Sequence, residues 1–459
     1  MTCIRKNMHR QFLPAILLGL ACALPAQAMT LTEALQLANQ HDPAVAVSAA
    51  TYDADREAGP QERGTLYPSV GASVAGSYAN TNSKGVFGNT KDSYPHWSAG
   101  IQAKQPLFRL DWSARGDRAA AEDDLADAGL ADRKQQTMRR VAERYFGVLV
   151  AQDELALAEA EAHAVRESLE DTRKRYEVEL VPGTDLKEAQ ARDDLSQAAL
   201  LSARRTLETA QDALDETTGN GRAALPRLAP DVHFPPLTPA DAESWVAAAG
   251  EHSPVIRAAK QQVEVAKANI SSRKSEAAPA LDLVASVNHN DNSKYRFGQQ
   301  VDDERVGVEL NVPIYAGGIN SSRVRQAEAV LRTAEADAQR VKLETERLTR
   351  QLFRDVQTAY AQEAAFQKAL ASAETAQEAT RNGYDAGTRT ITAVLDAKSR
   401  VVQAHRDLNQ TRYKLLLNLL QLKQNAGVLT EQDFTQIDQL LQISAAVAPT
   451  NPNLQESKP

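Results

Sequence analysis

Two stretches of the chain share one outline, a turn between two long helical patterns, and this duplication decides the fold. The first is YEVELVPGTDLKEAQAR (176–192), and the second is YDAGTRTITAVLDAKSR (384–400), which begins 208 residues later. In the second stretch, Gly387 interrupts the helical pattern, and a short run rich in β-branched residues follows before a helix resumes. A repeat at a fixed spacing indicates that the chain builds one structural unit more than once.

Three further pairs of motifs recur in the same order, so the duplication extends over most of the chain. They are HDPAVAVSAA and HSPVIRAAKQ (from 41 and 252), TLYPSVGASV and EAAPALDLVASV (from 65 and 276), and QPLFRLDWSARGDRAAAE and VPIYAGGINSSRVRQAEA (from 105 and 312). All the offsets lie between 207 and 211 residues. We therefore expect a first repeat over residues 29–218 and a second repeat over residues 241–428.

The segments outside the two repeats are poor in helical pattern. Residues 219–240 contain prolines at positions 226, 230, 235, 236 and 239. Prolines at that density interrupt a helix, so we interpret this segment as a linker. Residues 429–459 form a C-terminal segment, and its polar, proline-containing tail from Ala445 onward is expected to be disordered.

Residues 1–28 have the three parts of a secretory signal peptide. Arg5, Lys6 and Arg10 precede an apolar run, and Ala26-Gln27-Ala28 forms an A-x-A cleavage pattern. The alternative is a membrane anchor, but the apolar run is shorter than the about 20 residues that a spanning helix needs. We expect cleavage and export.

Removal of this segment would leave a chain without cysteine, because Cys3 and Cys22 both lie within it. No strong lipidation motif surrounds Cys22. Stability after export must then come from packing or assembly and not from disulfides. The exported chain would lose three basic residues and no acidic ones, so its formal net charge would move from −8 to −11. This charge argues against a nucleic-acid partner.

The pattern of each repeat predicts a mainly helical fold with some β structure. The expected elements are a helix (44–63 and 255–277), two strands around a polar loop (69–79 with 97–107, and 281–289 with 305–312), a long helix (113–178 and 321–385), and, after the turn, a second helix ending near residues 216 and 424. The first long helix would span about 100 Å at a rise of 1.5 Å per residue.

The predicted strands restrict the environment of the protein. Val306, Val308 and Leu310 alternate with polar residues, which is the period of a strand with two different faces. Four strands are too few to close a membrane barrel, since the smallest have about eight. A bilayer excludes the unpaired edges of an open sheet. Several chains must therefore share their strands if these enter a membrane, and the alternative is a soluble sheet covered by helices.

The helices after the two turns carry an apolar seam. Val394, Val401, Leu408, Leu415 and Leu422 recur every seven residues, as in a coiled coil. The first repeat aligns leucines at 186, 200, 207 and 214, and an aspartate at 193 interrupts the column. We interpret the seam as packing between helices, not as a ligand site.

The sequence does not support a catalytic, metal or cofactor site. The eight histidines are scattered without metal-ligand spacing, and no phosphate loop or dinucleotide fingerprint is present. An enzyme is therefore a weak interpretation of this sequence. A soluble periplasmic adaptor protein built from helical hairpins is a stronger one. Adaptors, however, do not normally contain two copies of a strand pair followed by a long helix.

The chain resembles the TolC family of outer-membrane efflux and secretion ducts over nearly all of residues 29–428. VPIYAGGINSSRVRQAEA (from 312) is similar to the family segment P-L-Y-x-G-G…S-R-V-R-Q-A. YDAGTRTITAVLDA (from 384) resembles the segment G-T-R-T…V-L-D-A, and LQLKQNAGVL (from 420) resembles the ending L-K-Q-x-A-G-x-L.

This resemblance implies a homotrimer in the outer membrane of a Gram-negative bacterium. Each chain would give four strands to a shared twelve-stranded barrel surrounded by lipid, and its helices to a periplasmic tunnel. The duct would conduct cargo passively from an inner-membrane ABC or RND transporter through a periplasmic adaptor. The missing lipidated cysteine and the fit to the protein-secretion branch favour type I secretion, and multidrug or metal efflux is the alternative.

The resemblance also implies that the two turns form a gate at the periplasmic tip. Tyr384 and Arg389 match positions that tie neighbouring helices together, and Asp185 matches their acidic partner. Asp396 matches one of two acidic positions around the entrance. The other falls at Ala393, which puts a double acidic ring in doubt. The turns contain Gly183 and Gly387, although the first turn has Glu179 where the family usually has glycine.

Simple helix geometry adds to this picture of the entrance. Asp396 follows Val394 by two residues and so points about 200° away from the seam, toward lumen or solvent. A ring of three such carboxylates attracts cations and raises its own pKa. Alternatively, both residues are ordinary acids in the first turn of a helix. There the helix dipole would favour Asp396, and Asp185 would belong to a helix N-terminus. Glu188 aligns with Asp396, and we hypothesise that it partly replaces the acid missing at Ala393.

Overall fold

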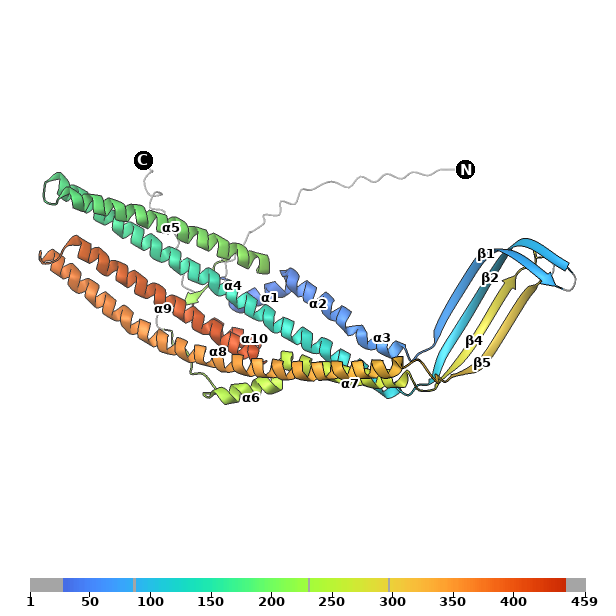
Figure 1. The fold of residues 1–459 in the computed structure, drawn as a ribbon. Helices are drawn as coiled ribbons and strands as arrows, with labels where there is room; N and C mark the ends of the chain where they lie inside the picture. The colour runs from blue at the N-terminus through green and yellow to red at the C-terminus, as the bar shows by residue number, and fades with distance from the viewer. Residues whose placement is uncertain (1–27, 86–87, 230–231, 296–297, 443–459) are drawn as a thin grey trace, which may run out of the picture.

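The computed structural model describes residues 28–85, 88–229, 232–295 and 298–442. Figure 1 shows an elongated helical body with a sheet at one end, and this sheet has four strands. The mainly helical fold with a small sheet is therefore confirmed. Most of the predicted signal peptide and the predicted tail lie outside the described residues. None of the described helices is both long enough and apolar enough to cross a lipid bilayer.

The two halves of the chain contain the same series of elements. The first half contains α1 (Leu31–His41), α2 (Pro43–Arg56), α3 (Ala58–Gly64), β1 (Ser69–Gly85), β2 (Gly88–Phe108), α4 (Trp112–Glu177) and α5 (Gly183–Thr218). The second half contains α6 (Ala242–His252), α7 (Pro254–Ser275), β4 (Ala280–Asp291), β5 (Gln300–Asn311), α8 (Ile319–Asp385) and α9 (Ile391–Asn425). The continuous helix α7 corresponds to the pair α2 and α3.

The helix ends repeat as closely as the helices. α2 and α7 both begin with proline, at Pro43 and Pro254. Proline lacks an N–H group, and at the first position of a helix this group would have no acceptor within the helix. α5 and α9 are both followed by a glycine in the left-handed region, Gly219 with φ of 68° and Gly427 with φ of 74°. The same local signals therefore set the same boundaries in both halves.

The strands are longer than the sequence predicts. β1 pairs with β2 without interruption from Ser69↔Lys104 to Gly85↔Gly88, so the predicted polar loop between residues 79 and 97 is mostly strand. β4 and β5 likewise extend to Asp291 and Gln300. The hydrogen bonds between strands join backbone groups only, so strand pairing can continue through polar residues. A prediction based on the alternation of apolar and polar residues assigns those residues to a loop.

The sheet has the order β1-β2-β4-β5, and all its neighbours are antiparallel. The central pair, β2 with β4, joins the two halves of the chain. β1 and β5 are the two edges, and no further strand pairs with either edge within the described part of the chain.

Two long helices, α4 and α8, run through the helical body (Figure 1). α9 and α7 follow one another end to end, and both pack against α4 and against α8. α5, α2 and α3 pack on α4. The predicted seam takes part in this packing, since Leu408, Leu415 and Leu422 of α9 are buried.

The segment between the repeats is not a free linker but part of the core. Its strand β3 (Arg227–Leu228) pairs with β6 (Leu441–Gln442), which follows helix α10 (Glu431–Leu440). Leu225 is buried in the main cluster beside Tyr145 and Phe146 of α4. The prolines thus prevent a helix without preventing burial.

The C-terminal helix also holds the first helix. Asp438 of α10 accepts hydrogen bonds from the backbone N–H groups of Leu31 (2.7 Å) and Thr32 (3.0 Å), at the N-terminus of α1. Tyr145 donates a hydrogen bond to the carbonyl of Met29 at 3.0 Å. The two ends of the described chain therefore meet at one place in the core.

Candidate functional site

The sheet has one apolar face and one polar face. Side chains that are directly paired across antiparallel strands lie on the same face. The apolar face carries Val70, Val74, Tyr78, Trp97, Ile101, Leu283, Val287, Val306, Val308 and Leu310. The other face carries Ser69, Ser73, Ser77, Gln102, Lys104, Asn288, Asp303 and Arg305. In the single chain the apolar face is open, with Val74 80% and Val306 79% exposed.

The apolar band crosses the strands obliquely. Val74 on β1 lies in the same row of paired residues as Asp302 on β5. On β5 the apolar residues Val306, Val308 and Leu310 lie farther toward the helical body. A band that shifts from strand to strand is expected when the strands are tilted relative to the layer that covers them.

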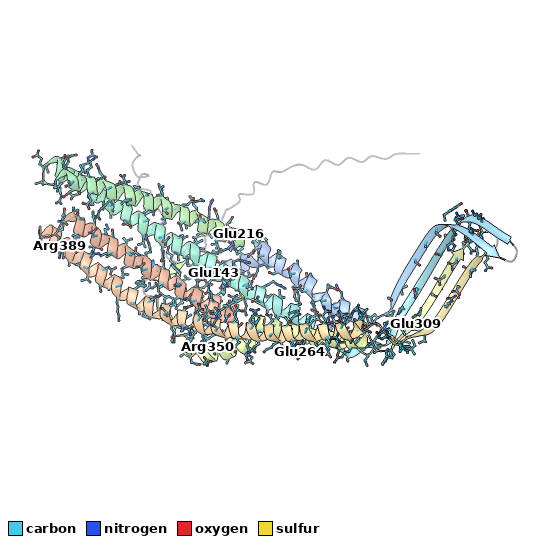
Figure 2. The ribbon with its side chains drawn as sticks, viewed as in Figure 1. Glu143, Glu216, Glu264, Glu309, Arg350 and Arg389 are labelled. Carbon is cyan, nitrogen blue, oxygen red and sulfur yellow. The ribbon has the colours of Figure 1, made fainter. Side chains whose placement is uncertain are left out.

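At the other end of the molecule, the hairpins α4–α5 and α8–α9 end in two equivalent turns. Arg389 lies at this end, far from the sheet, as Figure 2 shows. Leu180 N–H donates to the Arg175 carbonyl and Thr388 N–H donates to the Gly383 carbonyl, both at 2.8 Å. The two turns therefore close with the same backbone hydrogen bond.

The turn residues carry this geometry in different ways. Gly387 has φ of 71°, and its counterpart Glu179 has φ of 60°, a conformation that L-residues rarely adopt. Gly183, in contrast, begins α5 with ordinary backbone angles, and a Cβ there would lie 3.5 Å from the Tyr176 ring. Glu179, and not Gly183, is the structural equivalent of Gly387.

Asp396 is joined to the other hairpin by an arginine. Arg192 of α5 donates to Asp396 of α9 at 3.0 Å, and its second guanidinium nitrogen lies 3.5 Å from Glu188. The Asp396 side chain is 48% exposed and that of Arg192 is 30% exposed. The predicted acids Asp396 and Glu188 therefore lie together, but around a cation that partly cancels their charge.

Tyr384 also meets an arginine of the first hairpin. The Arg175 guanidinium lies over the Tyr384 ring, 5.2 Å from its centroid, as in a cation–π contact. Asp185 accepts a hydrogen bond from Thr184 at 3.3 Å. Arg389 has no ion pair with any residue that the structure describes. The single chain thus does not bring Asp185 and Arg389 together.

Sequence reasoning missed Arg175 and Arg192. The spacing of Glu188 and Arg192, four residues apart on a helix, is a signal for a local ion pair. No signal within one repeat indicates that Arg192 reaches Asp396, 204 residues away. These two arginines provide contacts between the hairpins within one chain.

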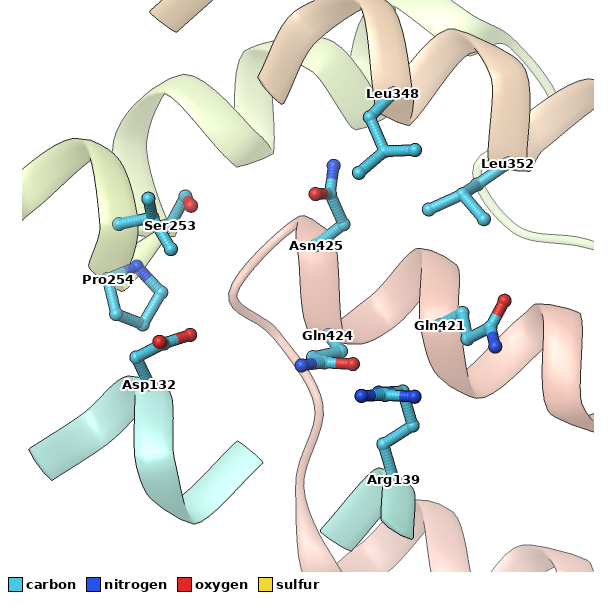
Figure 3. Close-up of a pocket in the computed structure, with 10 residues that line it drawn as sticks. Asp132, Arg139, Ser253, Pro254, Leu348, Leu352, Gln421, Gln424 and Asn425 are labelled. Carbon is cyan, nitrogen blue, oxygen red and sulfur yellow. The ribbon is translucent and has the colours of Figure 1, made fainter. Parts of the chain in front are cut away.

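A cavity of about 250 Å³ lies between α4, α7, α8 and α9, where α9 ends and α7 begins. Figure 3 shows amide side chains from α9, Gln421, Gln424 and Asn425, together with Asp132 and Arg139 of α4. Burial raises the pKa of Asp132. Within the described ranges, no three His, Cys, Asp or Glu side chains are placed to hold a metal ion.

Known proteins share this architecture. Residues 34–220 and 245–428 match the outer membrane efflux protein family. Outer membrane protein TolC of Vibrio cholerae is 33% identical over 447 residues, which cover 96% of this chain and 99% of that protein. Proteases secretion protein PrtF of Dickeya chrysanthemi is 29% identical over 450 residues, 96% and 97% of the two chains.

A solved structure shows the same fold. The outer membrane protein VceC from Vibrio cholerae aligns with a TM-score of 0.72 at 18% identity, over 86% of this chain and 96% of that chain. The relatives are channel proteins and not enzymes. This chain belongs to the outer membrane efflux protein family, as a TolC-type channel of the Gram-negative outer membrane.

Proposed function

We propose that the chain is the exit duct of a type I secretion system. As a homotrimer, it would conduct protein cargo passively from an inner-membrane ABC transporter, through a periplasmic adaptor, to the outside. The observation that carries the proposal is a sheet with an open apolar face and two unpaired edges, placed at the end of a long helical body.

The sheet supports the membrane part of this proposal. Lipid would cover the apolar face, and the polar face would line an aqueous pore. The edges β1 and β5 need partners in a bilayer, because no water satisfies their backbone groups there. Three copies would give twelve strands and close the barrel, and the oblique apolar band fits the strand tilt of such a barrel.

The helical body supports the periplasmic part. α4 has 66 residues, which corresponds to about 100 Å at the usual helical rise. A wall of such helices is long enough to form a tunnel. We propose that the ends of the hairpins form its entrance and gate, with Asp185, Glu188, Tyr384, Arg389 and Asp396 as gate residues.

The proposed cargo follows from the relatives. PrtF is by its name a protein of protease secretion, and it matches this chain over nearly its full length. An efflux duct would share the barrel and tunnel, so the transporter partner decides between the two uses.

The test is reconstitution in a Gram-negative strain that lacks its own TolC-type channel. The chain is expressed with an ABC exporter and an adaptor for a protease, and external protease is measured. The purified chain is also measured in planar lipid bilayers. We expect external protease and discrete conductance. Drug efflux without protease secretion would reject the secretion subtype, and absence of any conductance would reject the duct.

A further inference from the structure

A cavity of about 320 Å³ lies between α8, α9, α10 and the segment that joins the two repeats, and we call it the α10 pocket (Figure 1). α9 supplies Leu416, Leu419 and Leu420 to its wall, α10 supplies Ile437, and α8 supplies Tyr360. It is separate from the cavity in Figure 3, to which α4 and α7 contribute. Its volume falls within the range of about 300–1,000 Å³ that is usual for small-molecule sites.

The floor of the α10 pocket is apolar and buried. Leu416, Leu420 and Ile437 belong to the main hydrophobic cluster of the core. Leu415, a residue of the predicted seam, belongs to the second cluster, and Phe234 packs against both. The pocket therefore lies at the boundary between two clusters of the core, where it offers an apolar molecule surfaces on several sides.

The volume indicates the size of a molecule that would fit. An apolar cavity of about 150 Å³ in a protein core accepts benzene. The α10 pocket has about twice that volume, which corresponds to an alkyl chain of roughly ten carbon atoms.

The polar side chains of the pocket carry balanced charges. Lys423 of α9 and Asp433 of α10 form an ion pair, with side chains 22% and 9% exposed. Asp433 also accepts hydrogen bonds from the N–H (2.8 Å) and the hydroxyl (3.1 Å) of Thr430, in the capping box of α10. Gln436 and Gln439 are exposed and bring uncharged donors and acceptors to the pocket.

This balance selects against a charged head group. A carboxylate bound to Lys423 would also lie near the carboxylate of Asp433, and an ammonium group bound to Asp433 would lie near Lys423. Either ion would lose water without gaining a partner of its own, and burial of a charge is costly unless it is paired. An amide or a hydroxyl both donates and accepts, so it satisfies the pair without changing the net charge.

The walls of the pocket are tied to one another by polar contacts. Tyr360 of α8 donates a hydrogen bond to the carbonyl of Pro235, which holds the segment between the repeats against the hairpin. The ion pair of Lys423 with Asp433 joins α9 to α10. A site whose walls are held in place before binding loses less conformational freedom when its ligand arrives.

The position along the helices indicates that a ligand would come from the aqueous phase. Tyr360 lies 41 residues beyond Ile319, where α8 begins next to the sheet. That distance is about 60 Å at the usual helical rise, whereas the hydrocarbon core of a bilayer is about 30 Å thick. Bilayer lipid around the sheet therefore does not reach the pocket.

We propose that the α10 pocket binds an uncharged single-chain amphiphile with an amide or hydroxyl head group. Its alkyl chain lies against Leu416, Leu420 and Ile437, and its head group lies beside Lys423 and Asp433. α10 and the segment between the repeats belong to neither repeat, so one site is expected per chain. The proposal concerns a binding site in the helical body and does not depend on the cargo of the duct.

The first test locates the ligand with a photoreactive probe. The probe is decanamide with a diazirine at the end of its chain, and the full chain is held in lipid nanodiscs after removal of detergent, which would itself compete as a single-chain amphiphile. Irradiation and peptide mass spectrometry are expected to place cross-links on α9 around Leu416–Leu420 and on α10 around Ile437. Cross-links confined to the apolar face of the sheet would overturn the proposal.

The second test measures the choice of head group by competition against the probe. In the wild-type chain, decanamide is expected to compete at about tenfold lower concentration than decanoate or decylamine, because a charged head group remains unpaired. This comparison needs no variant, so it holds even if a substitution prevents folding. Equal competition by the three compounds would overturn the proposed head group.

Charge variants should then change the preference in opposite directions. Lys423→Gln leaves Asp433 alone and shifts the preference toward decylamine by about tenfold, whereas Asp433→Asn leaves Lys423 alone and shifts it toward decanoate. Lys414→Gln is the matched control, since this exposed lysine lies nine residues earlier and so on the opposite face of α9. A preference that is the same in all these variants would contradict the role of the ion pair.

A third test fills the pocket. Leu419 is half-buried in its wall, so Leu419→Trp is expected to abolish labelling, and Leu195→Trp, at a leucine of α5 that is 71% exposed, should leave labelling unchanged. A chain that ends at Ser444 examines the carboxyl-terminal segment as a rival occupant. Equal labelling of the full and shortened chains supports the proposal, and labelling of the shortened chain alone would overturn it.

Discussion

Glu179 and Gly387 hold the same left-handed backbone conformation at equivalent positions of the two hairpin turns, with φ of 60° and 71°. For an L-residue this conformation costs about 1–2 kcal/mol. The first turn therefore carries local strain that the second turn avoids. The shared hydrogen bond that follows each residue, from Leu180 and from Thr388, shows that the turns otherwise agree.

Glu179→Gly is expected to stabilise the first turn by about 1 kcal/mol, the strain relieved less the extra freedom of glycine in the unfolded chain. Gly387→Ala is expected to destabilise the second turn by about 1 kcal/mol from backbone strain alone, because a Cβ there meets no atom within 4 Å. Hydrogen exchange of the Leu180 and Thr388 amides measures both effects. Faster exchange at Leu180 in Glu179→Gly would contradict the strain.

Arg192 is expected to weaken the binding of cations at the entrance. It lies between Asp396 and Glu188, so Arg192→Gln removes a positive charge and strengthens block by a multivalent cation. Glu188→Ala removes an acid and weakens the block. Single-channel recordings with increasing cation concentration measure both, and Arg204→Gln, farther along α5, is the control. Equal block in all variants would show that this cluster is not on the ion path.

Arg389 and Asp185 are expected to hold the tip closed through contacts between copies. Among the side chains that the structure describes, the two are not paired with each other, and we expect them to find partners on a neighbouring copy. Arg389→Ala with Asp185→Ala is predicted to raise single-channel conductance severalfold. Tyr384→Leu, which removes the ring under Arg175, should add to the effect. Conductance at the wild-type level in the double variant would show that Arg389 does not hold the gate closed.

Asp153 is expected to make stability depend on pH. It lies in the core between Arg227 of β3 and Asn409 and Tyr413 of α9. Burial raises the pKa of Asp153, although Arg227 and the hydrogen bonds from Tyr413 and Asn409 oppose the shift. A raised pKa means that the folded state favours the neutral acid.

The stability contribution of Asp153 is therefore largest when the acid is protonated, and it falls as pH rises from the ordinary carboxyl range through the raised pKa. Asp153→Asn keeps a neutral polar group, so its melting temperature relative to wild type should increase from mildly acidic to neutral pH. Asp212→Asn, an exposed acid on α5, is the control. A difference that stays constant with pH would contradict the raised pKa.

The long helices could be predicted from the sequence because their periodic pattern of apolar residues extends over many turns. The helix expected over 113–178 is α4, Trp112–Glu177, since a periodic pattern over so many turns leaves little freedom at its ends. The short helices α1, α6 and α10 were not predicted. α1 is held in part by Asp438, more than 400 residues away, and no local pattern contains that information.

At the tip, too, local features could be predicted from the sequence and contacts between distant segments could not. The positions of the two turns follow from the repeat and from Gly387, so the sequence alone predicts them. The ion pair of Arg192 with Asp396 joins two hairpins and depends on how the helices pack. Its prediction would have needed the relative position of α5 and α9, which neither repeat specifies by itself.

The hydrogen bonds from Asp438 to the start of α1 have a consequence for biogenesis. Export would deliver the amino end first and the carboxyl end last. The first helix has a local capping box from Thr30 and Glu33, but the N–H groups of Leu31 and Thr32 obtain their acceptor only from one of the last elements. The core that joins the two repeats therefore stays incomplete until α10, with Phe434 and Ile437, arrives. A chain truncated before α10 would therefore leave the first two N–H groups of α1 without the Asp438 acceptor, although its local capping box would remain.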